Sequence, residues 1–286
     1  MGNKTWLLLR ELDILHVINL IILTVALQLR FSIMFDPYSY TGLAETLRRF
    51  AIRSFNEEYL DSLSNLYKYI DLNARFIEYQ YDVILFLGLG IGAIYSLSVT
   101  RWLVNEYVKI DIMLPFRRES VILIKFISIL TPTILLTITL YIFNVLIRYG
   151  GLDTYMLYPV SIFILHVYLI SSIALFISVM FRNELLTFFL PVVTHWFITD
   201  IVVNTLFGET HIKNFNFLSA IVLTGRYADM RRLIDVIIGI DNFTILPLPE
   251  TGEAMASILY ISIFLSIVGT IFLLIATYMF SRGEYD

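Results

Sequence analysis

The sequence predicts an all-α, polytopic membrane protein with six transmembrane helices in one transmembrane domain, residues 1–286. The chain is 58% hydrophobic and only 15% charged, whereas about a quarter of a soluble domain is charged. Its apolar residues also come in long blocks, and a helix needs about 20 such residues to cross the hydrocarbon core of a bilayer. The absence of cysteine excludes disulfides and thiolate chemistry, and a net charge of -4 argues against nucleic acid as a partner.

Six blocks reach the length that a membrane span needs. The first two are separated by a long polar insertion, the third is followed by "RYGGLD", and only "FRNE" lies between the fourth and the fifth. Glycines followed by an aspartate are typical of a tight connection between helices, so we expect helices three, four and five to follow one another closely. The six expected spans are about 12–34, 83–104, 121–147, 154–181, 184–207 and 254–280.

Small and helix-breaking residues within these blocks predict local packing. Gly88 and Gly92 form a small-xxx-small pair, which lets another helix approach closely. A nucleotide-binding glycine loop is the rival interpretation, but no strand is predicted before it. We expect Pro132 and Pro191 to kink the third and fifth spans.

The two long polar insertions, about 35–82 and 208–253, differ in their patterns. In the first, apolar residues recur at steps of three and four and charges occupy the other face, which predicts amphipathic helices. The second is half apolar but carries several charges, which favours a re-entrant-like or interfacial segment before span six. Both insertions hold more acidic than basic residues, and the short segments on the other side are denser in cations. The positive-inside rule therefore places both termini in the cytoplasm and both insertions outside the cell membrane.

The loop between spans two and three, about 105–120, concentrates charge between two apolar blocks. By the positive-inside rule alone it is a solvated cytoplasmic loop. A proline is tolerated at the start of a helix, so Pro115 can begin the helix that leads into span three. The polar or turn-forming residues of interest are Glu106, Lys109, Asp111, Pro115, Arg117, Arg118 and Glu119.

The order of residues in this loop carries a resemblance to a known family. An acidic residue followed by "MLPFRRESVILIKF" resembles the permease subunits of ATP-binding-cassette transporters of the type-2 exporter class (ABC-2 permeases), which carry a similar stretch between spans two and three. The layout of six spans, with a polar insertion after the first and a re-entrant-like segment before the last, is also similar to that family. The matching residues are Leu114, Pro115, Arg117, Arg118, Lys125 and Phe126.

The resemblance implies a permease that forms a translocation pathway and is not itself an enzyme. In such a transporter the loop is a coupling helix that docks on a separate ATPase subunit, which binds ATP and Mg, and two permease copies (a homodimer or a pair of related permeases) work together among membrane lipids. Spans one, two and five would line the pathway. The chain contains no Gly-x-x-x-x-Gly-Lys-Ser/Thr loop of its own.

Ionisable residues inside the spans are further candidates. His195 and Asp200 lie within span five, and charged or titratable groups in a membrane are functional candidates by default. They are possible pathway residues. The four histidines show no metal-ligand spacing. Two alternatives stay open: a secondary active transporter, which usually has an internal repeat and coupling-ion residues at mid-membrane, and an intramembrane enzyme, for which His166, His195 and Asp200 are the available groups.

Overall fold

In the computed structural model, every regular element of the described part of the chain is helical. No strand occurs among these residues, and the predicted all-α fold is confirmed for them. The external insertion at 35–82 and nearly all of the one at 208–253, with their expected amphipathic and re-entrant-like segments, lie outside the described residues. The described ranges are 14–34, 83–105, 107–113, 116–152, 158–207 and 251–283.

Four of the described helices are long and apolar enough to cross a membrane. They are Val83–Val104, Arg118–Ile147, Phe163–Phe181 and Leu259–Arg282. The apolar parts of the helices at the first and fifth predicted spans are shorter, at His16–Ser32 and Glu184–Thr199. The structure thus shows a helical bundle with four candidate membrane spans and two shorter apolar helices.

The described elements follow one another in chain order, with only short connections between the third and fifth predicted spans. Their bounds are α2 (Ile14–Met34), η2 (Ser96–Thr100, a π-helical segment within the Val83–Val104 helix), α5 (Arg101–Val104), α6 (Tyr107–Ile112), α7 (Arg118–Tyr149), α8 (Tyr158–Phe181), α9 (Glu184–Trp196), η4 (Phe197–Val202, also π-helical), α10 (Val203–Phe207) and α13 (Thr251–Arg282).

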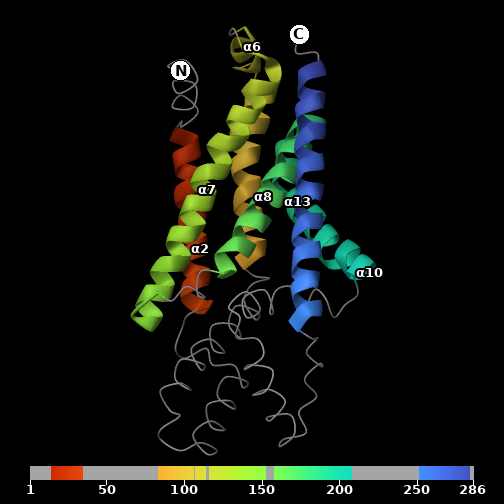
Figure 1. Cartoon of the computed structure of the whole chain (residues 1–286). Coiled ribbons are helices and arrows are strands. Elements are labelled where there is room, and N and C mark those ends of the chain that lie inside the picture. The colour runs from red at the N-terminus through yellow and green to blue at the C-terminus, as the bar shows by residue number, and fades with distance from the viewer. Residues whose placement is uncertain are drawn as a thin grey trace, which may run out of the picture.

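Helix α8 is the centre of the bundle. It packs against α7, α9 and α13, while α2 packs against α7 on the far side (Figure 1). Its most apolar stretch is 72% buried, against 22% for that of α13. Helix α13 therefore presents most of its apolar surface outward, as a lipid-facing helix does.

Aromatic side chains fill the core between α2, α7 and α8. The ring of Phe31 lies 6.1 Å from that of Tyr141 and 5.7 Å from that of Phe163, in both cases edge to face. Edge-to-face pairs at such distances add to the stabilisation that burial alone provides. This cluster holds α2 on the bundle.

The start of α7 differs from the expectation that Pro115 begins the helix. The helix begins at Arg118, and Arg117 before it is extended, with φ -66° and ψ 139°. Phe116 is partly buried against the core, so the chain packs an aromatic ring before it enters the helix. At the other end, Gly150 terminates α7 in the left-handed conformation with φ 69°, the backbone geometry in which glycine pays no steric penalty.

The second half of the fifth predicted span is not a regular α-helix. Pro132 and Pro191 both lie inside helices, α7 and α9, that continue past them. At Phe197 α9 passes into η4 and then α10, which points away from the bundle in Figure 1. π-helical turns inside α-helices are frequent at functional sites.

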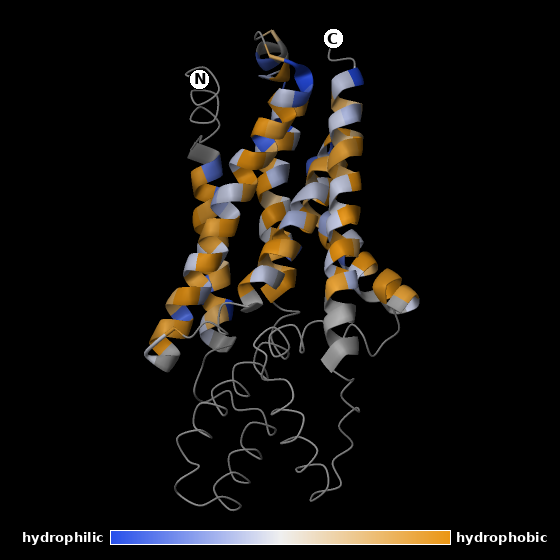
Figure 2. Cartoon of the chain, viewed as in Figure 1, coloured by the Kyte–Doolittle hydropathy of each residue, from blue (hydrophilic) through white to orange (hydrophobic). Residues whose placement is uncertain are grey.

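One end of the bundle gathers the features expected on the cytoplasmic side. Helix α6, the start of α2 and the end of α13 all lie toward this end in Figure 1. Figure 2 shows hydrophilic residues where α6 meets α7 and at the end of α13, with hydrophobic residues along the helices between the two ends. We call this end the α6 end.

Candidate functional site

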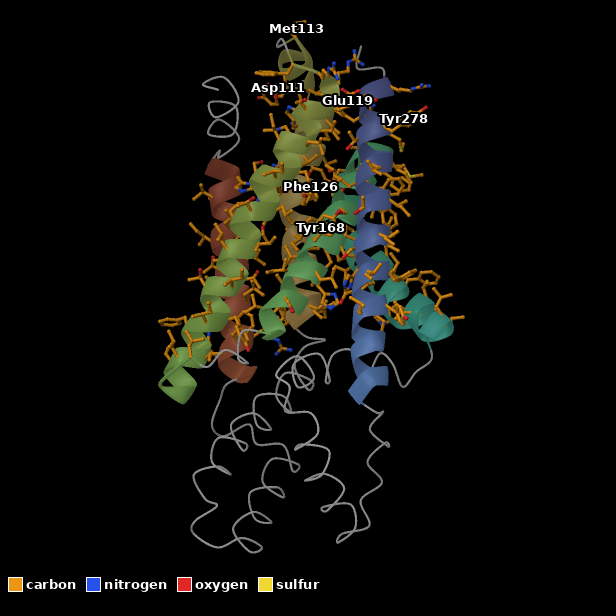
Figure 3. The ribbon with its side chains drawn as sticks, in the orientation of Figure 1. Asp111, Met113, Glu119, Phe126, Tyr168 and Tyr278 are labelled. Carbon is orange, nitrogen blue, oxygen red and sulfur yellow. The ribbon has the colours of Figure 1, made fainter. Side chains whose placement is uncertain are left out.

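Helix α6 is a separate short helix at one tip of the bundle. A turn at Asn105, whose N–H donates to the carbonyl of Arg101 at 2.8 Å, ends α5 and lets the chain change direction. Val108 and Asp111, three residues apart on one face, are both only 2% exposed. Tyr107 and Met113 are 61% and 85% exposed, and Met113 stands at the very tip in Figure 3. The helix is therefore anchored through Val108 and Asp111, and exposed side chains stand at its first residue and just beyond its last.

A buried polar cluster anchors α6 to the helices below it. The indole N–H of Trp102 donates to the Oδ2 atom of Asp111 at 2.8 Å. The ammonium of Lys125 lies 4.4 Å from the centroid of the Trp102 ring, a cation–π distance. Asp111 is 2% and Lys125 7% exposed. Charges are buried in proteins only where partners compensate their lost hydration, and Trp102 offers a partner to each of them. We call Trp102, Asp111, Lys125 and Phe280 the Trp102 cluster.

The fourth member of the cluster joins it to α13. The rings of Trp102 and Phe280 stack with centroids 5.6 Å apart and an interplanar angle of 26°. Phe280 is fully buried and lies in the last turn of α13. Phe126, one residue after Lys125, meets Tyr168 of α8 edge to face at 6.2 Å; Figure 3 labels both rings.

The two adjacent arginines of the loop have different surroundings. Arg118 donates from Nη1 to the carbonyl oxygen of Gly283 at 3.0 Å and, more weakly, to that of Ser281 at 3.5 Å. A cation at the end of a helix satisfies carbonyls that have no partner within the helix. Arg117 is exposed, as is Glu119 in the first turn of α7, where a carboxylate is favourable to the helix dipole.

The remaining predicted residues of the loop lie wholly or partly outside the described residues. Glu106 and Pro115 lie outside the described residues, and Lys109 is in α6 with a side chain that is also outside them. The structure thus brings Asp111, Arg117, Arg118 and Glu119 to the α6 end.

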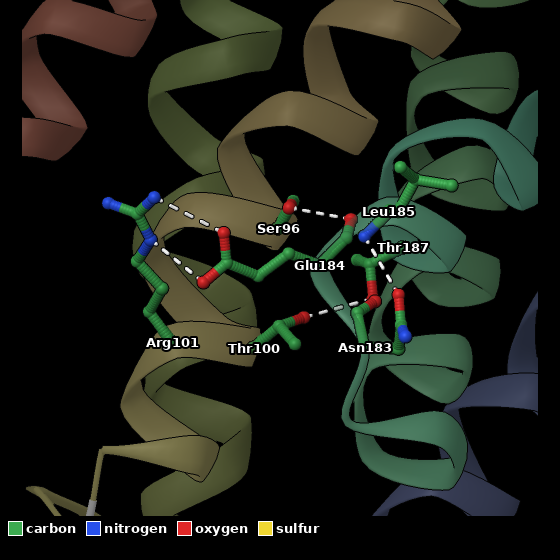
Figure 4. Close-up of polar contacts among 7 residues, drawn as sticks. All are labelled: Ser96, Thr100, Arg101, Asn183, Glu184, Leu185 and Thr187. Carbon is green, nitrogen blue, oxygen red and sulfur yellow. Dashed lines mark hydrogen bonds and ion pairs between the residues drawn. The ribbon is translucent and has the colours of Figure 1, made fainter.

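A second group of polar residues joins the second predicted span to the start of the fifth (Figure 4). Thr100 donates to Thr187 between their Oγ1 atoms at 2.9 Å, and both side chains are fully buried. Ser96 donates to the carbonyl of Glu184 at 2.7 Å. The carboxylate of Glu184 receives two bonds from Arg101, Nε to Oε1 at 2.9 Å and Nη2 to Oε2 at 3.2 Å. We call these five residues the polar seam.

The turn between α8 and α9 shapes the polar seam. Arg182 has a φ of 49°, a left-handed conformation that is uncommon for residues other than glycine. Asn183 then caps α9, accepting with its side-chain oxygen from the N–H groups of Leu185 and Leu186 at 3.0 and 3.1 Å. Asparagine is among the residues most favoured at this N-cap position. The cap directs the first turn of α9 toward η2.

The glycine pair of the second span lies against α9. A Cβ added at Gly92 would overlap the carbonyl oxygen of Phe188, and one added at Gly88 would come 2.9 Å from Cγ2 of Val192. The backbone of α9 therefore passes very close to Gly92. This approach brings Thr187 within reach of Thr100.

Two buried histidines meet between α8 and α9. The Nδ1 atom of His166 lies 2.9 Å from the Nε2 atom of His195, and the two side chains are 3% and 4% exposed. The second predicted pathway residue, Asp200, is in η4, and its side chain lies outside the described residues. A hydrogen bond between two imidazole nitrogens needs one proton between them, so at least one ring presents an N–H to the other.

Several residues of these groups carry no signal of their own in the sequence. Trp102, Glu184 and Thr187 become informative only when helices are packed. The histidine pair does leave a weak signal in the sequence. Helices α8 and α9 are joined by only two residues, and antiparallel neighbours place residues equally distant from the turn at similar depth. His166 and His195 differ in that distance by about one helical turn.

Among the described residues no three histidine, aspartate or glutamate side chains lie close enough together to hold a metal ion. Comparisons of the chain with protein-family models, with curated proteins and with solved structures found no match. The candidate site consists of an anchored short helix with exposed side chains at both ends, and of polar links between helices.

Proposed function

We propose that this chain is the permease subunit of an ATP-driven exporter of the ABC-2 type, and that α6 is its contact with a separate ATPase subunit. The observation that supports this most is the form of α6. It is a short helix set apart from the membrane-length helices, held by buried Val108 and Asp111, with exposed Tyr107 at its first residue and exposed Met113 just after its last. A free-standing loop would need no such anchor.

The exposed side chains at the two ends of α6 have the chemistry of a docking surface. Tyr107 and Met113 are large and exposed, and they lie at the hydrophilic end of the bundle. Apolar side chains rimmed by charge mark protein contacts, and helices that dock in this way lie in apolar grooves. Exposed Arg117 beside them would set specificity and association rate through acidic groups on the partner's rim.

The rest of the proposal follows from the resemblance to ABC-2 permeases and the layout of the chain. The two shorter apolar helices, α2 and α9 to α10, complete six spans, and both termini are in the cytoplasm of a cell-membrane protein. Two permease copies, a homodimer or a pair of related chains, form the pathway among membrane lipids. ATP and Mg are bound by the ATPase subunits, and this chain contributes no catalytic residue.

Copurification tests this proposal. The tagged protein is solubilised from its own membrane and the proteins that accompany it are identified by mass spectrometry. We expect an ATP-binding-cassette ATPase with the wild type and its loss with Met113→Glu plus Arg117→Glu. The matched control is Arg282→Glu, an exposed arginine at the same end but on α13, which should keep the partner. Absence of any such ATPase from the wild-type preparation would contradict the proposal.

One observation favours a second candidate, a secondary transporter. The buried pair His166 and His195 places two titratable groups inside the helical bundle, where such groups often mark ion or proton paths. This candidate predicts proton uptake by proteoliposomes that contain the purified chain alone, measured with an enclosed pH-sensitive dye, and its loss in His195→Phe. Proteoliposomes with no proton flux beyond that of empty vesicles would exclude it.

A further inference from the structure

We infer that Trp102 is a positioning residue that makes α6 and the end of α13 move as one body. The role of this link in transport rests on the proposed function, because it requires a partner that docks on α6 and moves α13 through the link. The link itself is a property of the isolated chain.

Trp102 contacts a different element with each part of its ring. Its N–H reaches Asp111 on α6 at 2.8 Å. One ring contact is with the ammonium of Lys125 on α7, at 4.4 Å, and another is the stack on Phe280 of α13, at 5.6 Å. The indole, itself on α5 and only 6% exposed, thus stands between three other helices.

These contacts cannot be exchanged for water when α6 shifts. Trp102 is buried, and a buried N–H donor that loses its acceptor keeps the full penalty of its lost hydration. A tilt of α6 alone would separate the N–H from the carboxylate. A tilt of α6 together with Trp102 keeps the bond and carries Phe280 along, because stacked rings in a close-packed interior have no free space between them.

A second contact makes the same connection from the start of α7. Arg118 holds the carbonyls of Ser281 and Gly283, on either side of the last residue of α13. The loop that contains α6 is therefore tied to α13 both before α6, through Trp102, and after it, through Arg118. This double attachment joins both ends of the loop to the last turn of α13 and the residue after it.

Helix α13 is one of the four long helices and extends away from the Trp102 cluster. Its apolar stretch is the least buried of the four, at 22%, so most of its surface faces away from the other helices. Its main neighbour is α8. We therefore assign α13 as the element through which a movement of α6 enters the membrane.

Spin-label distances test the link, since the chain contains no cysteine. Labels are placed at Tyr107→Cys on α6 and Ile267→Cys on α13, both exposed; at about 1.5 Å rise per residue, Ile267 lies about 22 Å below the end of α13. We expect one narrow distance distribution in the otherwise unchanged chain. Trp102→Phe, which keeps a ring beside Phe280 but removes the N–H, should lose that narrow peak.

Conservative variants separate positioning from general damage. Asp111→Asn keeps an acceptor for the indole N–H and should keep the narrow peak, whereas Asp111→Leu should lose it. Phe280→Leu, which leaves the hydrogen bond intact and removes the stacked ring, should also lose it. A reference pair, Leu29→Cys on α2 with Ile267→Cys, should stay unchanged in every variant.

The inference is overturned if the distribution from the α6 and α13 labels stays narrow in Trp102→Phe and in Phe280→Leu. If the reference pair broadens in Trp102→Phe, the variant is disturbed as a whole, and the contrast between Asp111→Asn and Asp111→Leu decides. These distances need no ATPase, so their failure leaves the copurification result intact. Conversely, loss of the ATPase from the wild-type preparation would overturn the proposed function and leave the mechanical link standing.

Discussion

Gly92 is the position where one added methyl group should disturb the bundle most. Its Cβ would overlap the carbonyl oxygen of Phe188, with the carbonyl carbon of Phe188 and the carbonyl oxygen of Thr187 both at 3.2 Å. These are backbone atoms, which cannot rotate aside, so Gly92→Ala must push α9 away. The shift would also stretch the hydrogen bond between Thr187 and Thr100.

The size of the effect follows from two opposing contributions. Forcing an extra methyl group into a packed core costs about 1–3 kcal/mol, and alanine is favoured over glycine within a helix by about 1 kcal/mol. For Gly92→Ala the net result is a loss of up to about 2 kcal/mol. For Gly88→Ala the neighbour is the methyl group Cγ2 of Val192 at 2.9 Å, which a small rotation can move, so the two contributions nearly cancel.

Thermal unfolding in detergent checks this order. Each kcal/mol moves the midpoint by about 2–4 °C for a chain of 150–250 residues, and all variants are heated at the same rate because membrane proteins often unfold irreversibly. Gly151→Ala is the matched control, since nothing lies within 4 Å of its added Cβ. We expect Gly92→Ala to melt below Gly88→Ala and Gly151→Ala. Equal midpoints for the three variants would refute the close approach of α9 at Gly92.

Three further predictions concern the hydrogen bonds between helices and at a helix start. His195→Phe should lower stability by about 1–3 kcal/mol because it leaves Nδ1 of His166 buried without its bond, and the double variant with His166→Phe should cost less than the sum of the two single changes; additive losses of melting temperature would contradict this. Thr187→Val should be less stable than Thr100→Val plus Thr187→Val, since only the single change strands a buried hydroxyl, and the reverse order in the same melting assay would be evidence against that bond. Asn183→Ala should cost about 1 kcal/mol by removing the cap of α9, and Asn183→Asp should restore the wild-type midpoint.

The helices were largely predictable because long apolar blocks leave the chain few other structures. The last block was expected at about 254–280 and the helix spans Thr251–Arg282, and "FRNE" marked the break between Phe181 and Glu184. Capping residues mark two further helix boundaries: Gly150 ends α7 and Asn183 starts α9. Pro115 suggested an earlier start for α7, but the helix begins at Arg118, after Phe116 has packed against the core and Arg117 has taken an extended conformation.

The contacts between helices could not be read from the sequence in the same way. Trp102 and Asp111 are close in the chain, yet they meet only because the turn at Asn105 redirects α6. The pairing of His166 with His195 depends on which faces α8 and α9 turn to each other, and helix packing sets those faces, including the close approach of α9 to Gly88 and Gly92.

A photoreactive amino acid at Met113 gives the most direct test of the central claim, that α6 docks on an ATPase. Met113 is 85% exposed at the tip beyond α6, and Ile147, 68% exposed at the other end of α7, is the control position. Irradiation in the native membrane should join Met113, but not Ile147, to an ATP-binding-cassette ATPase. Capture of the ATPase from neither position, or equally from both, would contradict the assignment of α6 as its docking helix.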